Sequence, residues 1–123
     1  KDELFYAEKN GGSYLNNKSI RVSKKNNFFD CLYGVNFRKN LPDDLIIRNT
    51  GSAALDLAYV SCGRFDGCLE KNVSLWDIAA GTVLIKEAGG IVDNFEFKEF
   101  SKISIKASNE RINGDLKKKI NIF

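Results

Sequence analysis

The spacing of the apolar residues changes at Thr50, and this change constrains the fold more than any other feature of the sequence. Before Thr50, short stretches rich in β-branched and aromatic residues are separated by turn residues, which is typical of strands. After Thr50, stretches with helical spacing alternate with further strand-like stretches. A β-rich first part followed by alternating strands and helices predicts an α/β sandwich, in which the later strands form a sheet with helices packed on it.

The first strands form a predicted hairpin. Residues 3–8 alternate moderately between apolar and polar side chains, and residues 13–22 follow after Asn10-Gly11-Gly12, a turn sequence that joins antiparallel strands. A second turn at residues 16–18 is expected to leave residues 19–22 as a short strand of their own.

Two more strands are expected before Thr50. Residues 30–37 mix aromatic, β-branched and small side chains and predict a buried strand interrupted by Gly34. A loop at residues 38–44 then leads to a short strand at residues 45–48.

The first predicted helix follows at once, with Thr50 as its N-cap and Gly63 as its C-terminal stop. The residues expected on its buried face are Ala54, Leu55, Ala58 and Tyr59. The remaining elements are expected to be a strand at 64–72, a helix from Ser74 to Gly89-Gly90, strands at 90–94 and 102–108, and an amphipathic helix at 109–120 with Ile112, Leu116 and Ile120 in line.

Length and charge exclude several classes of protein. A chain of 123 residues suffices for one domain with a real core, and its apolar runs are far shorter than the ~20 residues of a membrane helix. The net charge of +3 is modest and its basic residues are mostly interleaved with acids, so nucleic-acid binding is not expected, and Lys24-Lys25 and Lys117-Lys118-Lys119 are interpreted as solvated surface. Three cysteines without a C-x-x-C pair fit a reducing cytoplasm.

The chain contains no histidine, and this limits its chemistry. It cannot supply a Ser-His or Cys-His pair, a histidine base or an imidazole metal ligand. Any chemistry must come from carboxylates, hydroxyls, lysines, backbone amides or a hard cation. Methionine is also absent, even at position 1, so we expect the sequence to be part of a longer protein.

Asp77 lies beside the only tryptophan of the chain, and two roles are open for it. With Ser74 as N-cap, Asp77 occupies the third helical position, where its carboxylate can reach back to the N-cap amide and stabilise the helix by roughly 0.5 to 2 kcal/mol. Alternatively, Asp77 holds a ligand. The two roles are compatible, because a ligating carboxylate can lie in a first helical turn.

Two neighbouring features favour a ligand. Glu70, seven residues before Asp77, ends a predicted strand, and ligands of open α/β sheets gather where strands end and helices begin. Gly51, Ser52 and Ala53 expose backbone N–H groups at a helix start and have side chains too small to block a phosphate or a sugar hydroxyl. Each feature alone also has a purely structural explanation. Glu70 can be a solvated residue at a strand end, and the Gly51 turn can simply lead the chain into a helix.

The sequence also resembles a known family. The stretches "GSAALDLAYVSCGRFDGCLE" and "WDIAAGTVLIKEAGGIV" are similar to the C-terminal half of the inositol monophosphatase family, in particular its bacterial SuhB-like members, and "ELFYAEKNGGSYLNNKSIRVS" resembles that family's central hairpin. The resemblance covers nearly the whole chain. It implies the layered αβαβα sandwich of that family, here only the central hairpin plus the C-terminal sheet and its helices, with residues 1–40 ending the first sheet and 41–123 forming the C-terminal α/β part.

The resemblance further implies a Mg²⁺-dependent phosphomonoesterase that acts on a small phosphate monoester. By motif, Asp77 matches a metal ligand, Glu70 matches the residue that hydrogen-bonds the substrate hydroxyls, and Gly51, Ser52 and Ala53 match the turn that contacts the inositol ring. Oxygen ligands suit Mg²⁺, which can activate a water and neutralise a departing oxygen. The resemblance also implies a cytoplasmic protein that is a homodimer when complete.

Parts of the family pattern are missing. The other metal ligands, a glutamate and a D-P-x-D-G-T motif, have no counterpart here, so no residue is assigned as catalytic and the chain alone is expected to be inactive. A helix of about five turns that the family has between the strands near Phe37 and Ile47 is also absent. A non-catalytic interaction module, like SuhB-like proteins associated with the transcription machinery, is the alternative hypothesis.

Overall fold

The structure is a computed structural model that describes residues 2–97 and 103–120. Its first layer is a small antiparallel sheet with the order β1-β2-β3, made of β1 (Phe5–Glu8), β2 (Gly12–Leu15) and β3 (Lys18–Ser19). The predicted hairpin and its second turn are therefore confirmed, and both turns contain residues with positive φ, among them Asn10, Gly12 and Asn16. The third strand ends at Ser19, earlier than expected.

A five-stranded sheet forms the centre of the fold. Its strands are β4 (Leu32–Val35), β5 (Ile46–Arg48), β6 (Gly67–Val73), β7 (Ile91–Phe97) and β8 (Ile103–Ser108), in the order β5-β4-β6-β8-β7. β4 is parallel to both β5 and β6, whereas β8 is antiparallel to β6 and to β7. Because β4 lies inside this sheet, the division between the two sheets falls before residue 32, not at residue 40. The expected strand at 102–108 starts at Lys102, which lies outside the described residues.

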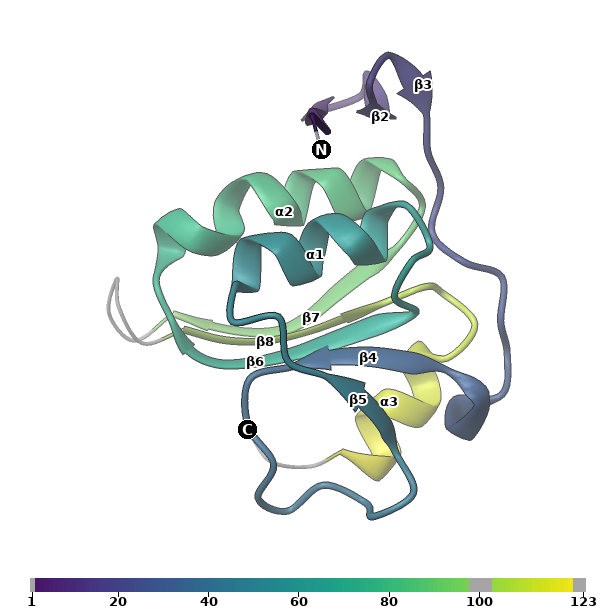
Figure 1. Ribbon diagram of the computed structural model, residues 1–123, viewed down its shortest axis with the longest axis vertical. Coiled ribbons are helices and arrows are strands. Elements are labelled where there is room, and N and C mark those ends of the chain that lie inside the picture. Colours follow the sequence, from purple (N-terminus) through teal and green to yellow (C-terminus); the bar gives the residue numbers. More distant parts are fainter. Residues whose placement is uncertain (1, 98–102, 121–123) are drawn as a thin grey trace.

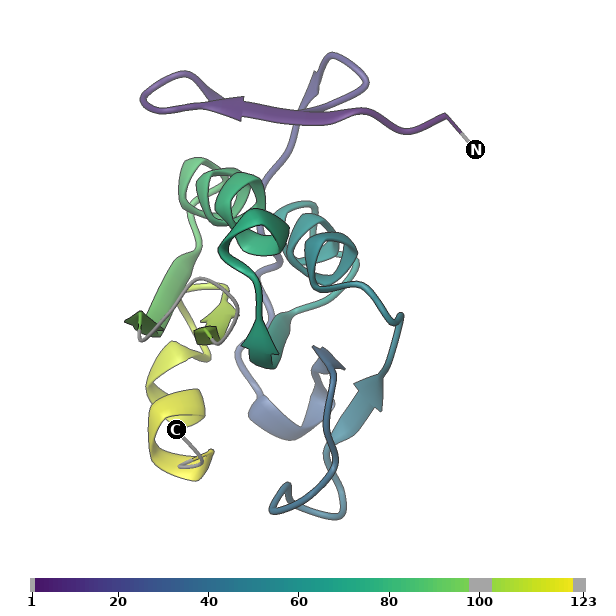
Figure 2. The same cartoon turned by 90° about the vertical axis from the view of Figure 1, so that its left-hand side faces the viewer.

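Helices cover both faces of this sheet (Figure 1). α1 (Ala53–Ser61) and α2 (Leu75–Glu87) lie side by side on one face, and α3 (Asn113–Lys119) lies on the other face beside the short 3-10 helix at Phe28–Asp30. Figure 2 shows the resulting order of layers, from the hairpin through the α1/α2 pair and the sheet to α3. The layered α/β sandwich expected from the sequence is thus confirmed.

Alternation along the strands divides the core into two clusters. On β6, Cys68 packs with the apolar residues under α1 and α2, and Leu69 packs with those under α3. Ile112, Leu116 and Ile120 are all buried in the second of these clusters, as their spacing predicted, although α3 itself begins only at Asn113.

The predicted buried face of the first helix is partly wrong. Ala54 and Leu55 are exposed, and the helix turns Asp56, Leu57 and Val60 inward instead. Its N-cap is Ser52, not Thr50, since the Ser52 hydroxyl accepts the backbone N–H of Leu55. The buried face is set by Leu57 and Val60, which pack in the cluster between the helices and the sheet.

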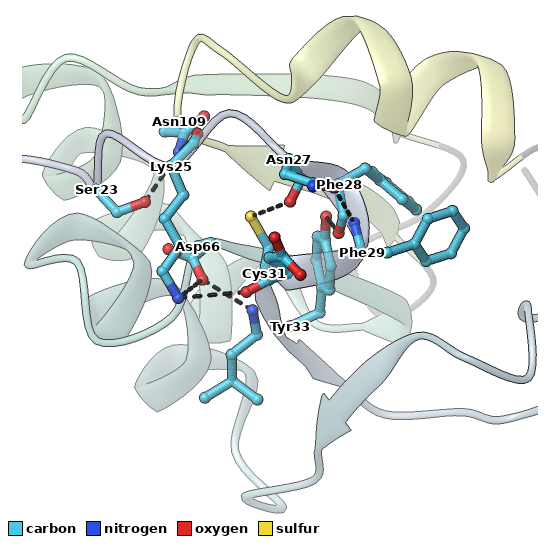
Figure 3. Close-up of polar contacts among 11 residues, drawn as sticks. Ser23, Lys25, Asn27, Phe28, Phe29, Cys31, Tyr33, Asp66 and Asn109 are labelled. Carbon is cyan, nitrogen blue, oxygen red and sulfur yellow. Dashed lines mark hydrogen bonds and ion pairs between the residues drawn. The ribbon is translucent and has the colours of Figure 1, made fainter.

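A cluster of polar contacts fastens the start of β4 to the start of β6 (Figure 3). Asp66, just before β6, is 3% exposed, accepts the backbone N–H of Leu32 at 2.8 Å and pairs with Lys25 at 3.6 Å. Asn109 donates from its side chain to Ser23 and to the carbonyl of Lys25. The Asp66 carboxylate therefore links the segment before β4, β4 itself and β6 through its Oδ2 atom.

The described part of the chain has no helix that combines the length and apolar character needed to cross a bilayer. Cys31, Cys62 and Cys68 are free thiols. Burial raises the pKa of Cys31 to about 11 and that of Cys68 well above its ordinary value, so both stay protonated and pack as apolar side chains.

Candidate functional site

A pocket of about 360 Å³ lies near the ends of β4 and β6 and the first residues of α1 and α2. This is the edge at which open α/β sheets bind ligands. Its lining contains every residue that the sequence analysis selected, namely Gly51, Ser52, Ala53, Glu70 and Asp77, together with Asn36, Asn72, Val73 and Ser74. The structure thus brings together three segments that are distant in the sequence.

The turn before α1 is held by its own side chains. The Thr50 hydroxyl accepts the backbone N–H of Ser52, and the Asn49 side chain accepts that of Gly51. Gly51 has a φ of +81°, a conformation that a residue with a side chain adopts only under strain. The turn therefore presents the first N–H groups of α1 next to the pocket, at the positive end of the helix dipole.

Asp77 stands at the start of α2, and its predicted role as a cap is not realised. Ser74 caps the helix by accepting the N–H of Trp76, and the Asp77 amide donates to the Ser74 carbonyl. Among the hydrogen bonds and ion pairs of the described residues, none engages the Asp77 carboxylate. An exposed carboxylate with no protein partner at a pocket rim is available to a ligand.

Glu70 forms the floor of the pocket. Its side chain is 1% exposed, and neither of its oxygens has a hydrogen-bond partner of acceptable geometry among the described residues. Burial raises the pKa of Glu70 to about 10, and the neighbouring Asp56 carboxyl adds to this rise. Glu70 is therefore a neutral carboxylic acid at neutral pH. Glu70 thus lies in the pocket lining beside a second buried carboxyl group, that of Asp56.

Asp56, which the sequence analysis did not select, lies in the first turn of α1, the helix whose start lines the pocket. It is 1% exposed and accepts a hydrogen bond of 2.6 Å from the Thr50 hydroxyl. Gly34 of β4 makes room for it, since a Cβ at Gly34 would lie 2.8 Å from the Asp56 carboxyl carbon. The spacing of apolar residues did not reveal the burial of Asp56, because a carboxyl group in a helix is ordinarily expected to face solvent.

Two asparagines in the lining were also missed. Asn36 follows β4 and binds the backbone of Lys71 twice, donating to its carbonyl and accepting its N–H, each at 2.9 Å. Asn72 has a positive φ of 55° just before the cap of α2. Asn36 could have been found from its place after a buried strand, because β4 and β6 end at the same edge.

The donor set fits Mg²⁺ only in part. Asp77 offers the hard oxygen ligand that Mg²⁺ prefers, and the neutral acid of Glu70 does not repel or strongly bind a cation. Among the described residues, no group of three or more His, Cys, Asp or Glu side chains is placed to hold a metal ion. A Mg²⁺ ion held through Asp77 would therefore need further ligands.

Comparison with known proteins defines the class of protein to which the chain belongs. The layered α/β fold is shared with solved structures of inositol monophosphatase and suhB proteins, and residues 1–121 match the inositol monophosphatase family. The chain belongs to this family, whose members are phosphomonoesterases.

The relatives include proteins with two different names. The chain is 39% identical to the inositol-1-monophosphatase of Rhizobium meliloti over 90% of its own length and 48% of the relative. It is 35% identical to the Nus factor SuhB of Xylella fastidiosa over 95% of its length and 49% of that protein. The crystal structure of the extragenic suppressor protein suhB from Bartonella henselae superposes with a TM-score of 0.86 at 40% identity, covering 97% of this chain and 54% of that one. The chain thus spans about half the length of the curated relatives it matches.

Proposed function

We propose that the chain is part of a Mg²⁺-dependent phosphomonoesterase that hydrolyses inositol monophosphate or a related sugar or polyol phosphate. In this proposal it supplies the side of the active site that binds the polyol, and one metal ligand. The observation that carries it is that Gly51, Ser52, Ala53, Glu70 and Asp77, selected from sequence alone, line a single pocket. The three free thiols fit a reducing cytoplasm as the compartment.

The pocket has the chemistry to bind a polyol phosphate. The acid of Glu70 donates one hydrogen bond to a hydroxyl oxygen and accepts another from a hydroxyl group. The small residues at the start of α1 let a ring approach the backbone, and two helix N-termini favour oxygen-rich, anionic ligands. Such a pocket orients the polyol so that its phosphate projects toward Asp77.

Asp77 is the residue that would hold Mg²⁺ in this chain. When bound, the cation activates a water and neutralises the departing oxygen. The chain itself keeps the Asp77 carboxylate free for this role, because Ser74 takes over the capping of α2. One carboxylate holds Mg²⁺ weakly, so we propose that the remaining ligands come from chain that precedes the hairpin in the complete protein.

The test compares phosphate release from inositol 1-phosphate with Mg²⁺ by two proteins. One is the 123-residue chain, and the other is a version extended upstream to include the D-P-x-D-G-T motif. The proposal expects turnover only in the extended protein, with loss of turnover on removing Mg²⁺. Equal Mg²⁺-dependent turnover by the short chain would contradict the assignment of missing ligands, and no turnover by the folded extended protein would contradict the enzyme.

A non-catalytic role in transcription is the second candidate, favoured by the similarity to the Xylella fastidiosa Nus factor SuhB. The test measures binding of the extended protein to a purified transcription elongation complex, with and without the Asp77→Asn change. Equal binding by both proteins, together with no phosphatase activity of the extended protein, would favour this role.

A further inference from the structure

The strand β6 contains a bulge at the edge of the sheet where the pocket lies. Its pairing with β8 is regular up to Glu70 and resumes only at Val73, through the pairs Glu70–Ile105 and Val73–Ile103. The two residues in between, Lys71 and Asn72, therefore lie opposite the single residue Ser104 of β8. Two residues opposite one make a β-bulge, which bends the strand and re-aims its side chains.

The bulge changes which side chains β6 presents to α1 and α2. In a regular strand, residues three positions apart face opposite sides of the sheet. Glu70 and Val73 instead lie on the same side, since both line the pocket and Val73 packs against the cluster under α1 and α2. Ser74, the N-cap of α2, follows at once, and Asp77 lies in the first turn of that helix. The bulge thus brings Glu70 and Asp77 to a common pocket.

The backbone of the bulge is unusual at Asn72. Its φ of +55° lies in the left-handed region, which residues with a side chain seldom adopt and which asparagine tolerates better than most. Such a conformation persists only where the surrounding structure holds it in place.

The side chain of Asn36 holds the bulge from the neighbouring strand. The backbone ladder between β4 and β6 ends at the pair Val35–Leu69. Beyond this pair, the Asn36 carboxamide donates to the carbonyl of Lys71 and accepts its N–H, each at 2.9 Å. One side chain therefore bonds both peptide groups of the first bulge residue and continues the ladder where the backbone pairing has stopped.

Lys71 is also held through its ammonium group. Its Nζ lies 4.8 Å from the centroid of the Phe37 ring, which packs against the cluster under α3. The two consecutive residues Asn36 and Phe37 thus fix the backbone and the side chain of Lys71. In the described part of the chain, no other side chain exchanges a hydrogen bond with residues 71–73.

We propose that Asn36 is a positioning residue for the pocket. Its carboxamide fixes the bulge of β6, and the bulge sets Glu70 and the start of α2, with Asp77, on one side of the sheet. Asn36 acts through Lys71 and not on a ligand, because its oxygen and its nitrogen both bond the Lys71 peptide. The consequence for turnover rests on the proposed function, whereas the effect on the bulge does not.

The first experiment examines the bulge by NMR in the 123-residue chain, with and without Asn36→Ala. Asn36 is exposed, so its truncation leaves the core intact. We expect the Lys71 amide to exchange about tenfold faster in the variant, the scale for losing one hydrogen bond, and the backbone shifts of Asn72 to leave their left-handed values. Unchanged Lys71 exchange and unchanged Asn72 shifts would overturn the proposal.

Asn16→Ala is the matched control. The Asn16 carboxamide also bonds two backbone groups, the N–H of Leu4 and the carbonyl of Asp2, but it lies in the hairpin and outside the pocket lining. We expect this variant to leave the signals of Lys71 and Asn72 unchanged. Equal changes in both variants would show that general destabilisation, and not the Asn36 contact, controls the bulge.

A second variant covers the case in which Asn36→Ala does not fold. Asn36→Asp keeps the acceptor for the Lys71 N–H and loses the donor to the Lys71 carbonyl at neutral pH. We expect the Lys71 amide to stay protected and the amide signal of Asn72, which shares a peptide group with that carbonyl, to shift. A signal of Asn72 identical to that of the wild type would overturn the proposal.

The second experiment measures turnover of inositol 1-phosphate by the extended protein against the concentrations of substrate and Mg²⁺. We expect Asn36→Ala to lower kcat by roughly tenfold to a hundredfold, the scale for a small misplacement of reacting groups, and to raise the Mg²⁺ concentration needed for half-saturation. Asn16→Ala should leave both values unchanged.

Two outcomes of this experiment would contradict the account in different ways. A rise in KM for the substrate alone would assign Asn36 to direct substrate binding and overturn the positioning role. No turnover by the wild-type extended protein would overturn the proposed function and the consequence for turnover together, and the NMR experiment would still decide whether Asn36 holds the bulge.

Discussion

Gly81 of α2 lies against Leu57 of α1 so closely that a Cβ at position 81 would be 2.5 Å from the Leu57 Cβ. Both residues are buried, and the helices cannot separate without exposing the cluster that they share with the sheet. We therefore expect Gly81→Ala to destabilise the chain by about 1 to 3 kcal/mol, the usual cost of overpacking a core. Urea denaturation followed by circular dichroism measures the change.

Gly114→Ala is the matched control for this substitution. Gly114 also lies in a helix, but a Cβ there would meet nothing within 4 Å. The same exchange should stabilise the chain by up to about 1 kcal/mol, through lower entropy of the unfolded state and better helix propensity. Equal destabilisation by both substitutions would show that the close approach of the two helices is not the cause.

Glu87 at the end of α2 fastens the hairpin to the rest of the fold. Its carboxylate accepts the backbone N–H of Asn10 at 2.8 Å and of Gly12 at 2.9 Å, and these bonds lower its pKa. Because the folded form releases its proton more readily than the unfolded form, the contribution to stability is present above the ordinary pKa of a glutamate and is lost as the pH falls through the lowered value. The hairpin should therefore loosen in acid.

Amide hydrogen exchange of Asn10 and Gly12 measures this effect. We expect protection in the wild type to fall on acidification, after correction for the intrinsic exchange rate, and to be low at every pH in Glu87→Gln. Glu8→Gln serves as the control, since Glu8 is exposed on the same hairpin. A pH response that survives in Glu87→Gln would contradict the assignment.

The sequence was sufficient to select five residues of the pocket lining because they belong to short motifs. Ser74 caps α2 as expected and Asp77 lies in its first turn, whereas Glu70 does not end its strand, because β6 continues to Val73. Such local signals do not depend on how the sheet is assembled. The position of β4 between β5 and β6 depends on pairings between distant residues, so the spacing of apolar residues could not reveal it.

Asp56 illustrates a different limit of sequence analysis. The structure buries it, although it was not among the residues expected on the buried face of its helix. Its burial depends on Gly34 of β4, which leaves space for the carboxyl, and on Thr50 before α1, which donates a hydrogen bond to it. These partners come from separate elements, and no local pattern links them.

Asp77→Asn tests the proposed metal ligand in the extended protein. The carboxylate is exposed and none of the hydrogen bonds of the described residues engages it, so the thermal midpoint should not change. Turnover with Mg²⁺ should fall by about a hundredfold or more, the scale for losing one group that stabilises charge in a transition state. Asp43→Asn, at an exposed site in the loop after β4, is the control. Unchanged turnover would leave Asp77 without a metal-binding role.

Glu70→Gln should stabilise the folded chain while it weakens polyol binding in the pocket. The folded form holds the Glu70 proton up to a pKa of about 10, whereas the unfolded form releases it near the ordinary pKa of 4.5. Wild-type stability must therefore fall as the pH rises between these two values, and glutamine, which does not ionise, escapes this loss. At neutral pH we expect Glu70→Gln to be more stable by roughly 2 to 4 kcal/mol, and at about pH 4 to equal the wild type.

Urea denaturation of both proteins across this range isolates Glu70, because every other titrating group is common to the two. The amide introduced by Glu70→Gln keeps a donor and an acceptor on the pocket floor, so weakened polyol binding would reflect its changed shape and not the loss of a charge. A stability difference that does not grow with pH would show that Glu70 ionises inside the folded chain. The Glu70 side chain would then be a buried carboxylate anion that requires a cation as its partner.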